Sequence, residues 1–176
     1  MKKRFDKNYT IEILKHIDNS LRGYQKKFPV YLLGGSALIL KGSQEFSKDM
    51  DFITTADGHI AMGDILLRLK RERDITIDIF RDGQFPDYRY ENYYMKAEHI
   101  FSLRHLEVYV LDYTDIILTK CITNRESDLE VILSLKKNFT VPKNELIERY
   151  SKIIPSKNKE EEFRKRFENF LNVYYK

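Results

Sequence analysis

Residues 30–53, with the sequence VYLLGGSALILKGSQEFSKDMDFI, constrain the fold more than any other part of the chain. The segment begins with an apolar run typical of a buried strand and breaks at a Gly-Gly-Ser turn. A short apolar helix follows and ends at Gly42. The last residues alternate between polar and apolar, which is the period of a strand. The segment therefore predicts a strand, a tight turn, a helix and a second strand in direct succession.

Two aspartates stand on the second of these strands. Asp49 and Asp51 are two residues apart, so both carboxylates point to the same face of the strand. Two neighbouring carboxylates repel each other unless a cation lies between them. Mg²⁺ suits such a pair, because it takes hard oxygen ligands and is usually held by one or two carboxylates together with waters and substrate phosphates. The pair therefore predicts a magnesium site.

The Gly-Gly-Ser turn is suited to bind a phosphate and so complements the metal site predicted at the aspartate pair. Gly34 and Gly35 allow the backbone to approach a phosphate closely, and Ser36 adds a hydroxyl donor at the start of a helix. Each half also has an ordinary explanation, as a strand-to-helix turn with a serine cap and as two solvated acids on a strand. Together they favour one phosphate and metal site built from two halves.

Composition narrows the class of protein. The chain has 176 residues, of which 42% are hydrophobic and 33% charged, as in a globular domain with or without a helical extension. Its net charge of +4 is compatible with nucleotide or RNA substrates but is far from a strong nucleic-acid signature. The single cysteine excludes an intrachain disulfide. Without an apolar N-terminal segment or a membrane-spanning run, a cytoplasmic protein is expected.

Hydrophobic periodicity predicts alternating strands and helices. Thr10 is the predicted N-cap of the first helix, and Asp115 is predicted to cap or open a later one. A mixed α/β (α+β) fold is expected, with a small mixed β-sheet flanked by helices in a domain of residues 1–141 and a C-terminal helical extension at 142–176. Strands are predicted at 29–33, 49–54, 75–80, 98–103 and 106–111, and helices at 9–27, 36–41, 58–72, 113–122, 127–137, 143–154 and 158–176.

Three other segments have plain interpretations. Cys121 is expected to be buried rather than reactive, since nothing near it in the sequence would stabilise a thiolate. The tyrosines at 88–94 are expected to pack in the core and on the surface, with a base-stacking platform as the alternative. The charged run at 158–168 is expected to form a solvated helix face with ion pairs four residues apart.

The stretch GGSALILKGSQEFSKDMDF resembles the signature of the polymerase-β-type nucleotidyltransferases, which place a Gly-Gly/Ser turn, a helix and then Asp-x-Asp on a strand. Twelve residues separate Ser36 from Asp49, within the spacing that this superfamily tolerates. The resemblance implies the nucleotidyltransferase fold and a third acid on a later strand. Asp78 in TIDIF fits that position, and Glu107 in LEVYV is a second candidate; Asp78 is also compatible with an ordinary surface residue.

A second stretch, LEVYVLDYTDIILTKCITNRESDLEVI, is similar to small prokaryotic nucleotidyltransferases related to abortive-infection and type IV toxin–antitoxin toxins. The resemblance implies that Lys120 meets the triphosphate and that Asp128 is a recurrent polar residue, with Arg125 in the turn between them. An ordinary solvated lysine and a helix-opening acid are the alternatives. Many relatives carry an arginine before the aspartate pair, where this chain has Gln-Glu-Phe-Ser-Lys.

Taken together, the resemblances imply an Mg²⁺-dependent enzyme, with one or two ions, that moves a nucleoside monophosphate from an NTP to a hydroxyl of tRNA, a protein or a small molecule. The alternative is a catalytically silent nucleotide-binding protein or a toxin–antitoxin interaction protein, with a cognate antitoxin as its partner. The implied catalytic and metal residues are Asp49, Asp51 and Asp78, and the implied nucleotide-binding residues are Gly34, Gly35, Ser36, Lys120 and Asp128.

Overall fold

The computed structural model describes residues 4–123, 126–136 and 139–176. The chain divides into two compact units: unit 1 is Met1–Gly83 with Lys96–Leu111, and unit 2 is Gln84–Met95 with Asp112–Lys176. The domain boundary expected at residue 141 therefore falls inside unit 2, because unit 2 also takes in the chain from Asp112 onward. Within the described residues, every helix is too short or too polar to cross a membrane.

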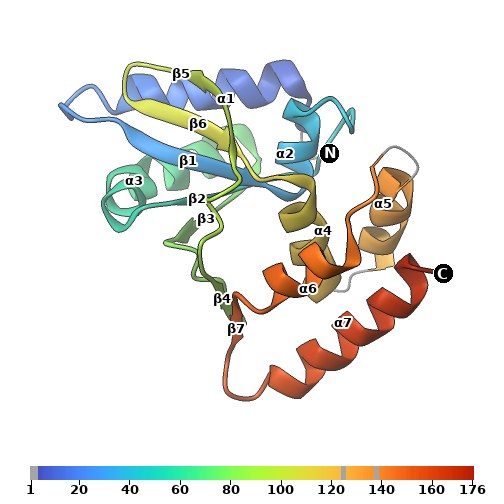
Figure 1. The fold of residues 1–176 in the computed structure, drawn as a ribbon. Coiled ribbons are helices and arrows are strands. Elements are labelled where there is room, and N and C mark those ends of the chain that lie inside the picture. Colours follow the sequence, from blue (N-terminus) through green and yellow to red (C-terminus); the bar gives the residue numbers. More distant parts are fainter. Residues whose placement is uncertain (1–3, 124–125, 137–138) are drawn as a thin grey trace. The chain divides into compact units, whose positions relative to one another are not determined.

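Unit 1 is built on a five-stranded sheet with the strand order β3-β2-β1-β6-β5 (Figure 1). β1 is antiparallel to β2 and parallel to β6, β2 is parallel to β3, and β5 is antiparallel to β6. The prediction of a mixed sheet is thus confirmed. The bounds of the strands are β1 Phe28–Leu33, β2 Asp49–Thr54, β3 Thr76–Arg81, β5 Glu98–Ser102 and β6 Leu106–Val110, and those of the helices are α1 Lys7–Ser20, α2 Gly34–Leu40 and α3 Ala56–Arg73.

The two faces of this sheet differ in character. Alternation along the strands turns one set of apolar side chains into the core, where Val30, Phe52 and Val108 are 0% exposed. α3 contacts β1 and β3, and α1 packs against α3. The opposite face carries Asp51 and the stacked rings of Tyr31 and Tyr109, whose centroids are 4.9 Å apart. The aspartates therefore lie on the face opposite the apolar core.

The first helix begins earlier than predicted. The N-cap of α1 is Asp6, whose carboxylate accepts a hydrogen bond from the backbone N–H of Tyr9 at 2.7 Å. Thr10, the predicted cap, lies inside the helix, where its hydroxyl donates to the carbonyl of Asp6. Both residue types cap helices well, but Asp6 lies one turn earlier, so the helix starts earlier. The prediction is also wrong at the other end, because the helix stops at Ser20 rather than at residue 27.

In its described residues, unit 2 has four helices and a two-stranded antiparallel sheet of β4 and β7. α4 contacts α5, α6 and α7. The prediction of a continuous helix over 143–154 is wrong at its end, because α6 stops at Tyr150 and Ile153 pairs with Tyr90 in the small sheet. The bounds are β4 Tyr88–Tyr90, α4 Tyr113–Thr123, α5 Glu126–Lys136, α6 Lys143–Tyr150, β7 Ile153–Pro155 and α7 Glu160–Tyr174.

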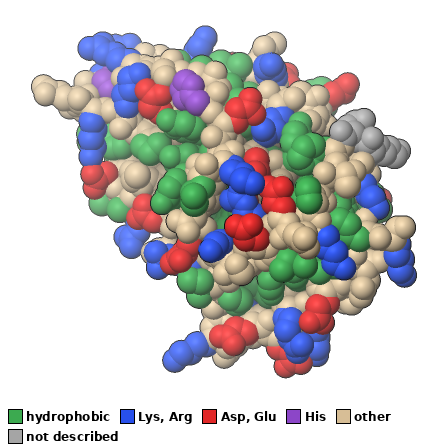
Figure 2. Space-filling view, in the orientation of Figure 1, with side chains coloured by type: hydrophobic (Ala, Val, Ile, Leu, Met, Phe, Trp, Pro, Cys, Tyr) green, Lys and Arg blue, Asp and Glu red, His purple; other side chains and the backbone are tan. Residues whose placement is uncertain are grey.

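The plain interpretations of three segments are confirmed. Cys121 is 4% exposed, and burial raises the pKa of its thiol to about 12. Tyr88, Tyr90 and Tyr93 are buried and Tyr94 is 52% exposed, so this segment packs both in the core and at the surface. α7 carries three ion pairs four residues apart, between Glu161 and Lys165, Glu162 and Arg166, and Arg164 and Glu168. On the face shown in Figure 2, basic and acidic side chains are interspersed.

A buried polar cluster in unit 2 replaces the predicted capping role of Asp115. Asp112 performs the capping, since its Oδ1 accepts the backbone N–H of Asp115 at 2.8 Å. Asp115 itself is 0% exposed, accepts a hydrogen bond from the hydroxyl of Tyr90, and lies 3.5 Å from the guanidinium of Arg149. Burial and the neighbouring Asp112 raise the pKa of Asp115 to about 7.

This raised pKa predicts a pH-dependent stability. The folded protein binds more protons than the unfolded chain between the ordinary pKa of 3.8 and about 7. The free energy of unfolding should therefore fall as the pH rises through this window, by about 2–3 kcal/mol between pH 5 and pH 8. Asp115→Asn should remove that part of the slope, measured by urea unfolding at both pH values. An equal slope in the wild type and in Asp115→Asn would contradict the assignment.

Candidate functional site

The two halves predicted for the site lie side by side in unit 1. The register of β1 and β2 pairs Leu33 with Asp51, so the end of β1 brings the glycine turn next to the second aspartate. Gly34 has a φ of +57°, and a Cβ on it would stand 3.6 Å from Oδ2 of Asp51. A side chain there would be strained as well as close to the carboxylate. The Gly34 backbone and the Asp51 carboxylate are therefore neighbours.

Ser36 joins the two halves in a way that differs from the expectation. Its hydroxyl is buried and lies 2.8 Å from the carbonyl oxygen of Leu33 and 3.1 Å from that of Asp51. A hydroxyl has one proton to donate, and these backbone carbonyls take it. Ser36 thus ties the start of α2 to β2 rather than pointing its hydroxyl to an open site.

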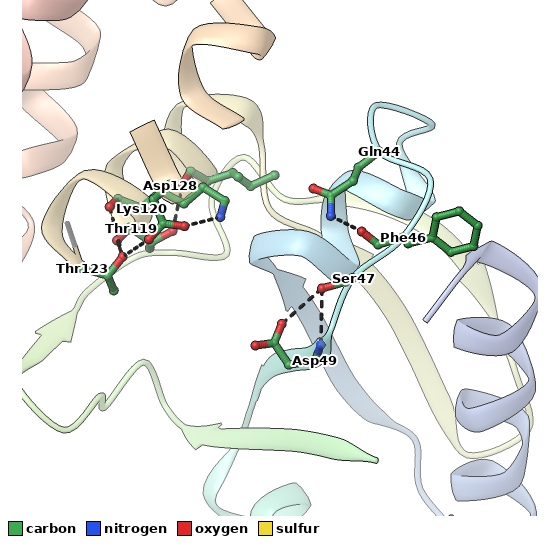
Figure 3. Close-up of polar contacts among 9 residues, drawn as sticks. Gln44, Phe46, Ser47, Asp49, Thr119, Lys120, Thr123 and Asp128 are labelled. Atoms are coloured by element: carbon green, nitrogen blue, oxygen red, sulfur yellow. Dashed lines mark hydrogen bonds and ion pairs between the residues drawn. The ribbon is translucent and has the colours of Figure 1, made fainter. Parts of the chain in front are cut away.

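Asp49 and Asp51 are both half-buried and point to the same face of β2. Asp49 accepts a hydrogen bond on Oδ1 from the hydroxyl of Ser47 at 3.1 Å (Figure 3). A carboxylate has about four lone-pair sites, so this bond leaves acceptor capacity on Asp49. The pair offers hard oxygen donors from two adjacent carboxylates.

Ser47 lies beside the candidate site, although no motif in the sequence marks it. A Cβ on Gly35 would lie 2.3 Å from the Oγ of Ser47 and 2.9 Å from its Cβ, so only glycine fits beneath this side chain. Ser47 therefore lies between the glycine turn and Asp49. Its position two residues before the aspartate pair was the available signal, because such a residue is well placed to donate to a carboxylate on the same strand end.

Asp78 is paired with Asp51 in the strand register, but its side chain forms an ion pair with another residue. β2 and β3 pair these two residues directly. The Asp78 side chain is 53% exposed and forms an ion pair of 3.2 Å with Lys70 of α3. Among the residues that the structure describes, no three His, Cys, Asp or Glu side chains are grouped to hold a metal ion. The expected third carboxylate is thus a neighbour of the pair without forming a three-acid cluster with it.

Glu107, the second candidate for the third acid, lies elsewhere on the sheet. It pairs with Pro29 at the start of β1, whereas Asp51 pairs with Leu33 at the end of β1. Four residues of strand separate these positions, roughly 13 Å. Hydrogen bonds from Lys27 and Ser102, with a further one from His99, lower the pKa of Glu107 to about 2. Of the two candidates, only Asp78 is next to the aspartate pair.

Lys120 and Asp128 belong to unit 2, where they bind each other. The ammonium of Lys120 lies 2.7 Å from Oδ1 of Asp128, and the hydroxyl of Thr123 donates to Oδ2 at 2.9 Å (Figure 3). Both charged side chains are largely buried, at 15% and 10% exposed. The third residue of this prediction, Arg125, lies outside the described residues. The two residues thus bind each other, and their implied roles toward a nucleotide stay predictions.

The donor set of unit 1 fits Mg²⁺ held by two carboxylates. Mg²⁺ keeps several waters and binds proteins through one or two carboxylates together with substrate phosphates. Asp49 and Asp51 supply that number, and the adjacent Gly34 has no side chain to stand against Oδ2 of Asp51. The arrangement can hold a cation on one side and a phosphate against the glycine backbone on the other.

Comparison with known proteins gives one family and one fold. The model of the family described as "Nucleotidyltransferase of unknown function (DUF6036)" matches residues 10–174. No curated protein sequence matches the chain. The crystal structure of an antigenic nucleotidyltransferase-like protein from Paracoccidioides brasiliensis is similar with a TM-score of 0.53 at 12% identity, over 97% of this chain and 91% of that one. At this identity the likeness shows the fold alone.

Proposed function

Because the chain belongs to the family of nucleotidyltransferases of unknown function, whose model spans residues 10–174, we propose that it transfers a nucleoside monophosphate from an NTP to an acceptor hydroxyl. One observation carries the proposal: the backbone of Gly34 lies against the carboxylate of Asp51, with 3.6 Å between a Cβ position and Oδ2. Nucleotidyl transfer needs a phosphate held next to a metal, and this contact joins a phosphate-binding turn to a metal-binding strand.

Asp49 and Asp51 hold Mg²⁺, one ion or two, and the backbone of Gly34 and Gly35 receives the β- and γ-phosphates. Bound Mg²⁺ polarises the reacting phosphorus and offsets the negative charge of the phosphate oxygens. The acceptor oxygen forms a bond to the α-phosphorus, the bond from that phosphorus to the bridging oxygen of the pyrophosphate breaks, and pyrophosphate leaves. Asp78, the next carboxylate in register, takes the proton of the acceptor hydroxyl.

The rate enhancement in this scheme comes from position and charge rather than from a covalent intermediate. Ser36 keeps the turn and β2 together, so that the phosphate and metal subsites stay in register. The acceptor is a hydroxyl of tRNA, of a protein or of a small molecule, and a cognate antitoxin is the proposed protein partner. The net charge of +4 favours RNA slightly among these acceptors.

The test is a transfer assay with each α-labelled NTP, Mg²⁺ and either total tRNA, cell lysate or a panel of small alcohols. We expect label in one of these fractions with wild-type protein, and none with Asp49→Ala or Asp51→Ala. The absence of transfer with every NTP, together with the absence of Mg²⁺-dependent nucleotide binding, would contradict the proposal.

A second function is favoured by the ion pair between Asp78 and Lys70. If Lys70 keeps this carboxylate occupied, the chain binds nucleotides without turning them over. Calorimetry with each Mg-NTP separates the two functions, because a silent binding protein gives heat of binding without label transfer. Lys70→Ala removes the partner of Asp78. In a silent binding protein this variant should switch transfer on, whereas in an active transferase it should leave the transfer rate within about twofold of wild type.

Lys120 provides a further prediction. Its ammonium has three N–H donors, and the contacts among the described residues assign one of them to Asp128. If another meets the triphosphate, Lys120→Met should weaken Mg-NTP binding roughly 10–100-fold, the size of a charged hydrogen bond. Calorimetry measures the affinity.

The double variant Lys120→Met with Asp128→Asn is the control for this prediction. It removes both charges and so leaves neither one buried without a partner. A triphosphate role predicts that the double variant regains thermal stability but not affinity. Recovery of affinity together with stability would instead assign the pair a purely structural role.

A further inference from the structure

A residue that precedes the first helix is paired with the site. Phe5 and Ser47 form an isolated antiparallel bridge with two backbone hydrogen bonds of 2.8 Å, one in each direction. Both polar groups of the Ser47 backbone are therefore satisfied by one residue that is distant in the sequence. Ser47 lies in the loop at residues 41–48 between α2 and β2, so the bridge holds this loop two residues before Asp49.

The bridge is anchored on a helix rather than on a loose strand end. The ring of Phe5 is 0% exposed, and its centroid lies 5.4 Å from that of Tyr9 in α1. The next residue, Asp6, caps α1 by accepting from the N–H of Tyr9. The buried ring of Phe5 and the helix cap at Asp6 therefore both hold in place the backbone that forms the bridge.

Movement of Ser47 would alter both halves of the site. Its hydroxyl donates to Oδ1 of Asp49 at 3.1 Å, and the same oxygen occupies the space above Gly35, 2.3 Å from where a Cβ would stand. A shift of Ser47 therefore turns the Asp49 carboxylate and uncovers the glycine turn together. The bridge joins Phe5 to Ser47 and the ring contact joins it to Tyr9, so its influence on the site passes through Ser47.

We propose that residues 4–6 act as a latch that positions Ser47, and through it Asp49 and the glycine turn, for Mg-NTP binding. Phe5 is the positioning residue of this latch, which rests on the proposed function of the site. Preorganised sites bind more tightly because their groups need no ordering when the ligand arrives. Releasing the latch should therefore weaken nucleotide binding while every group that contacts the ligand is still present.

The test compares Phe5→Ala with a matched control, Ile17→Ala, and with the conservative variant Phe5→Leu. Ile17 is also 0% exposed but lies farther along α1. Both alanine variants should lower the Tm, since each leaves a cavity. Phe5→Ala alone should weaken Mg-NTP binding by roughly tenfold in calorimetry, since it loses preorganisation, and Phe5→Leu should restore it. The backbone amide of Ser47 should also exchange with deuterium roughly tenfold faster in Phe5→Ala, through local opening.

The outcomes separate the latch from the proposed function. Wild-type affinity and unchanged Ser47 exchange in Phe5→Ala, with a Tm loss equal to that of Ile17→Ala, would overturn the latch. Equal losses of affinity in both alanine variants would overturn it too, because global destabilisation would then explain the effect. If the wild type binds no Mg-NTP, the proposed function fails, and the exchange rate at Ser47 still decides whether residues 4–6 hold the loop.

Discussion

Asp49→Asn and Asp51→Asn are each expected to reduce nucleoside monophosphate transfer by about 10³-fold, the loss of several kcal/mol of charge stabilisation at the reacting phosphate. Asparagine keeps the shape and one oxygen of aspartate but loses the charge that holds a divalent cation. Mg²⁺-dependent NTP binding should weaken in parallel. Transfer of α-label and calorimetry with Mg-NTP measure the two effects.

Asp57→Asn is the matched control for these variants. Asp57 is an exposed acid of α3 in the same unit, paired with Lys26 on the surface. It should leave transfer and affinity at wild-type values. In metal-free protein the Asp49 and Asp51 variants should keep their Tm, because removing one of two adjacent carboxylates relieves repulsion. Transfer rates within a few-fold of wild type in both variants would contradict a metal site at Asp49 and Asp51.

Gly35→Ala is expected to destabilise unit 1 and weaken the candidate site through a single added methyl group. The added Cβ would lie 2.3 Å from Oγ and 2.9 Å from Cβ of Ser47, distances that force one residue to move. Overpacking of this kind costs about 1–3 kcal/mol of stability. Because Ser47 also donates to Asp49, the displacement should weaken Mg-NTP binding by at least roughly tenfold through lost preorganisation. Urea unfolding and calorimetry measure the two losses.

Two variants make this prediction specific. Gly63→Ala adds a methyl group in α3 where nothing lies within 4 Å, so it should be neutral or stabilising by about 0.5–1 kcal/mol. The double variant Gly35→Ala with Ser47→Gly removes both overlapping atoms and should regain stability relative to Gly35→Ala. It should not regain full affinity, since the hydrogen bond to Asp49 is lost. Wild-type affinity in Gly35→Ala would show that the turn is not part of the site.

The sheet and the aspartate pair were predictable because local patterns determine them. The apolar run at β1, the apolar residues around Glu107 at β6 and the alternation at the start of β2 indicate strands whatever their partners are. Two aspartates at i and i+2 share a face in any strand. The resemblance to nucleotidyltransferases rested on the same local segment, and the family match confirms it.

Other features depend on register and could not be derived from local patterns. Asp78 lies beside Asp51 because β3 pairs with β2, whereas Glu107 pairs with Pro29 at the other end of β1. Only the strand pairing reveals which of the two acids lies next to the aspartate pair. Ser47 was missed for the same reason, since its importance comes from the close approach of Gly35 and from the bridge to Phe5.

Short elements were missed because their sequence signal is weak. β4 and β7 have three residues each, and the pairing of Tyr90 with Ile153 stabilises both across a long stretch of chain. The sequence around Ile153 has helical periodicity, so α6 was extended through it. Tertiary pairing overrides local propensity in such segments.

The most direct test of the central claim follows the two ends of the triphosphate. Wild-type protein is incubated with Mg²⁺, an acceptor fraction and either α-labelled or γ-labelled NTP. Nucleotidyl transfer predicts that α-label joins the acceptor, that γ-label leaves in pyrophosphate, and that Asp51→Asn abolishes both. Transfer of γ-label to the acceptor, or α-label that stays in free nucleotide with every NTP and acceptor, would contradict the claim.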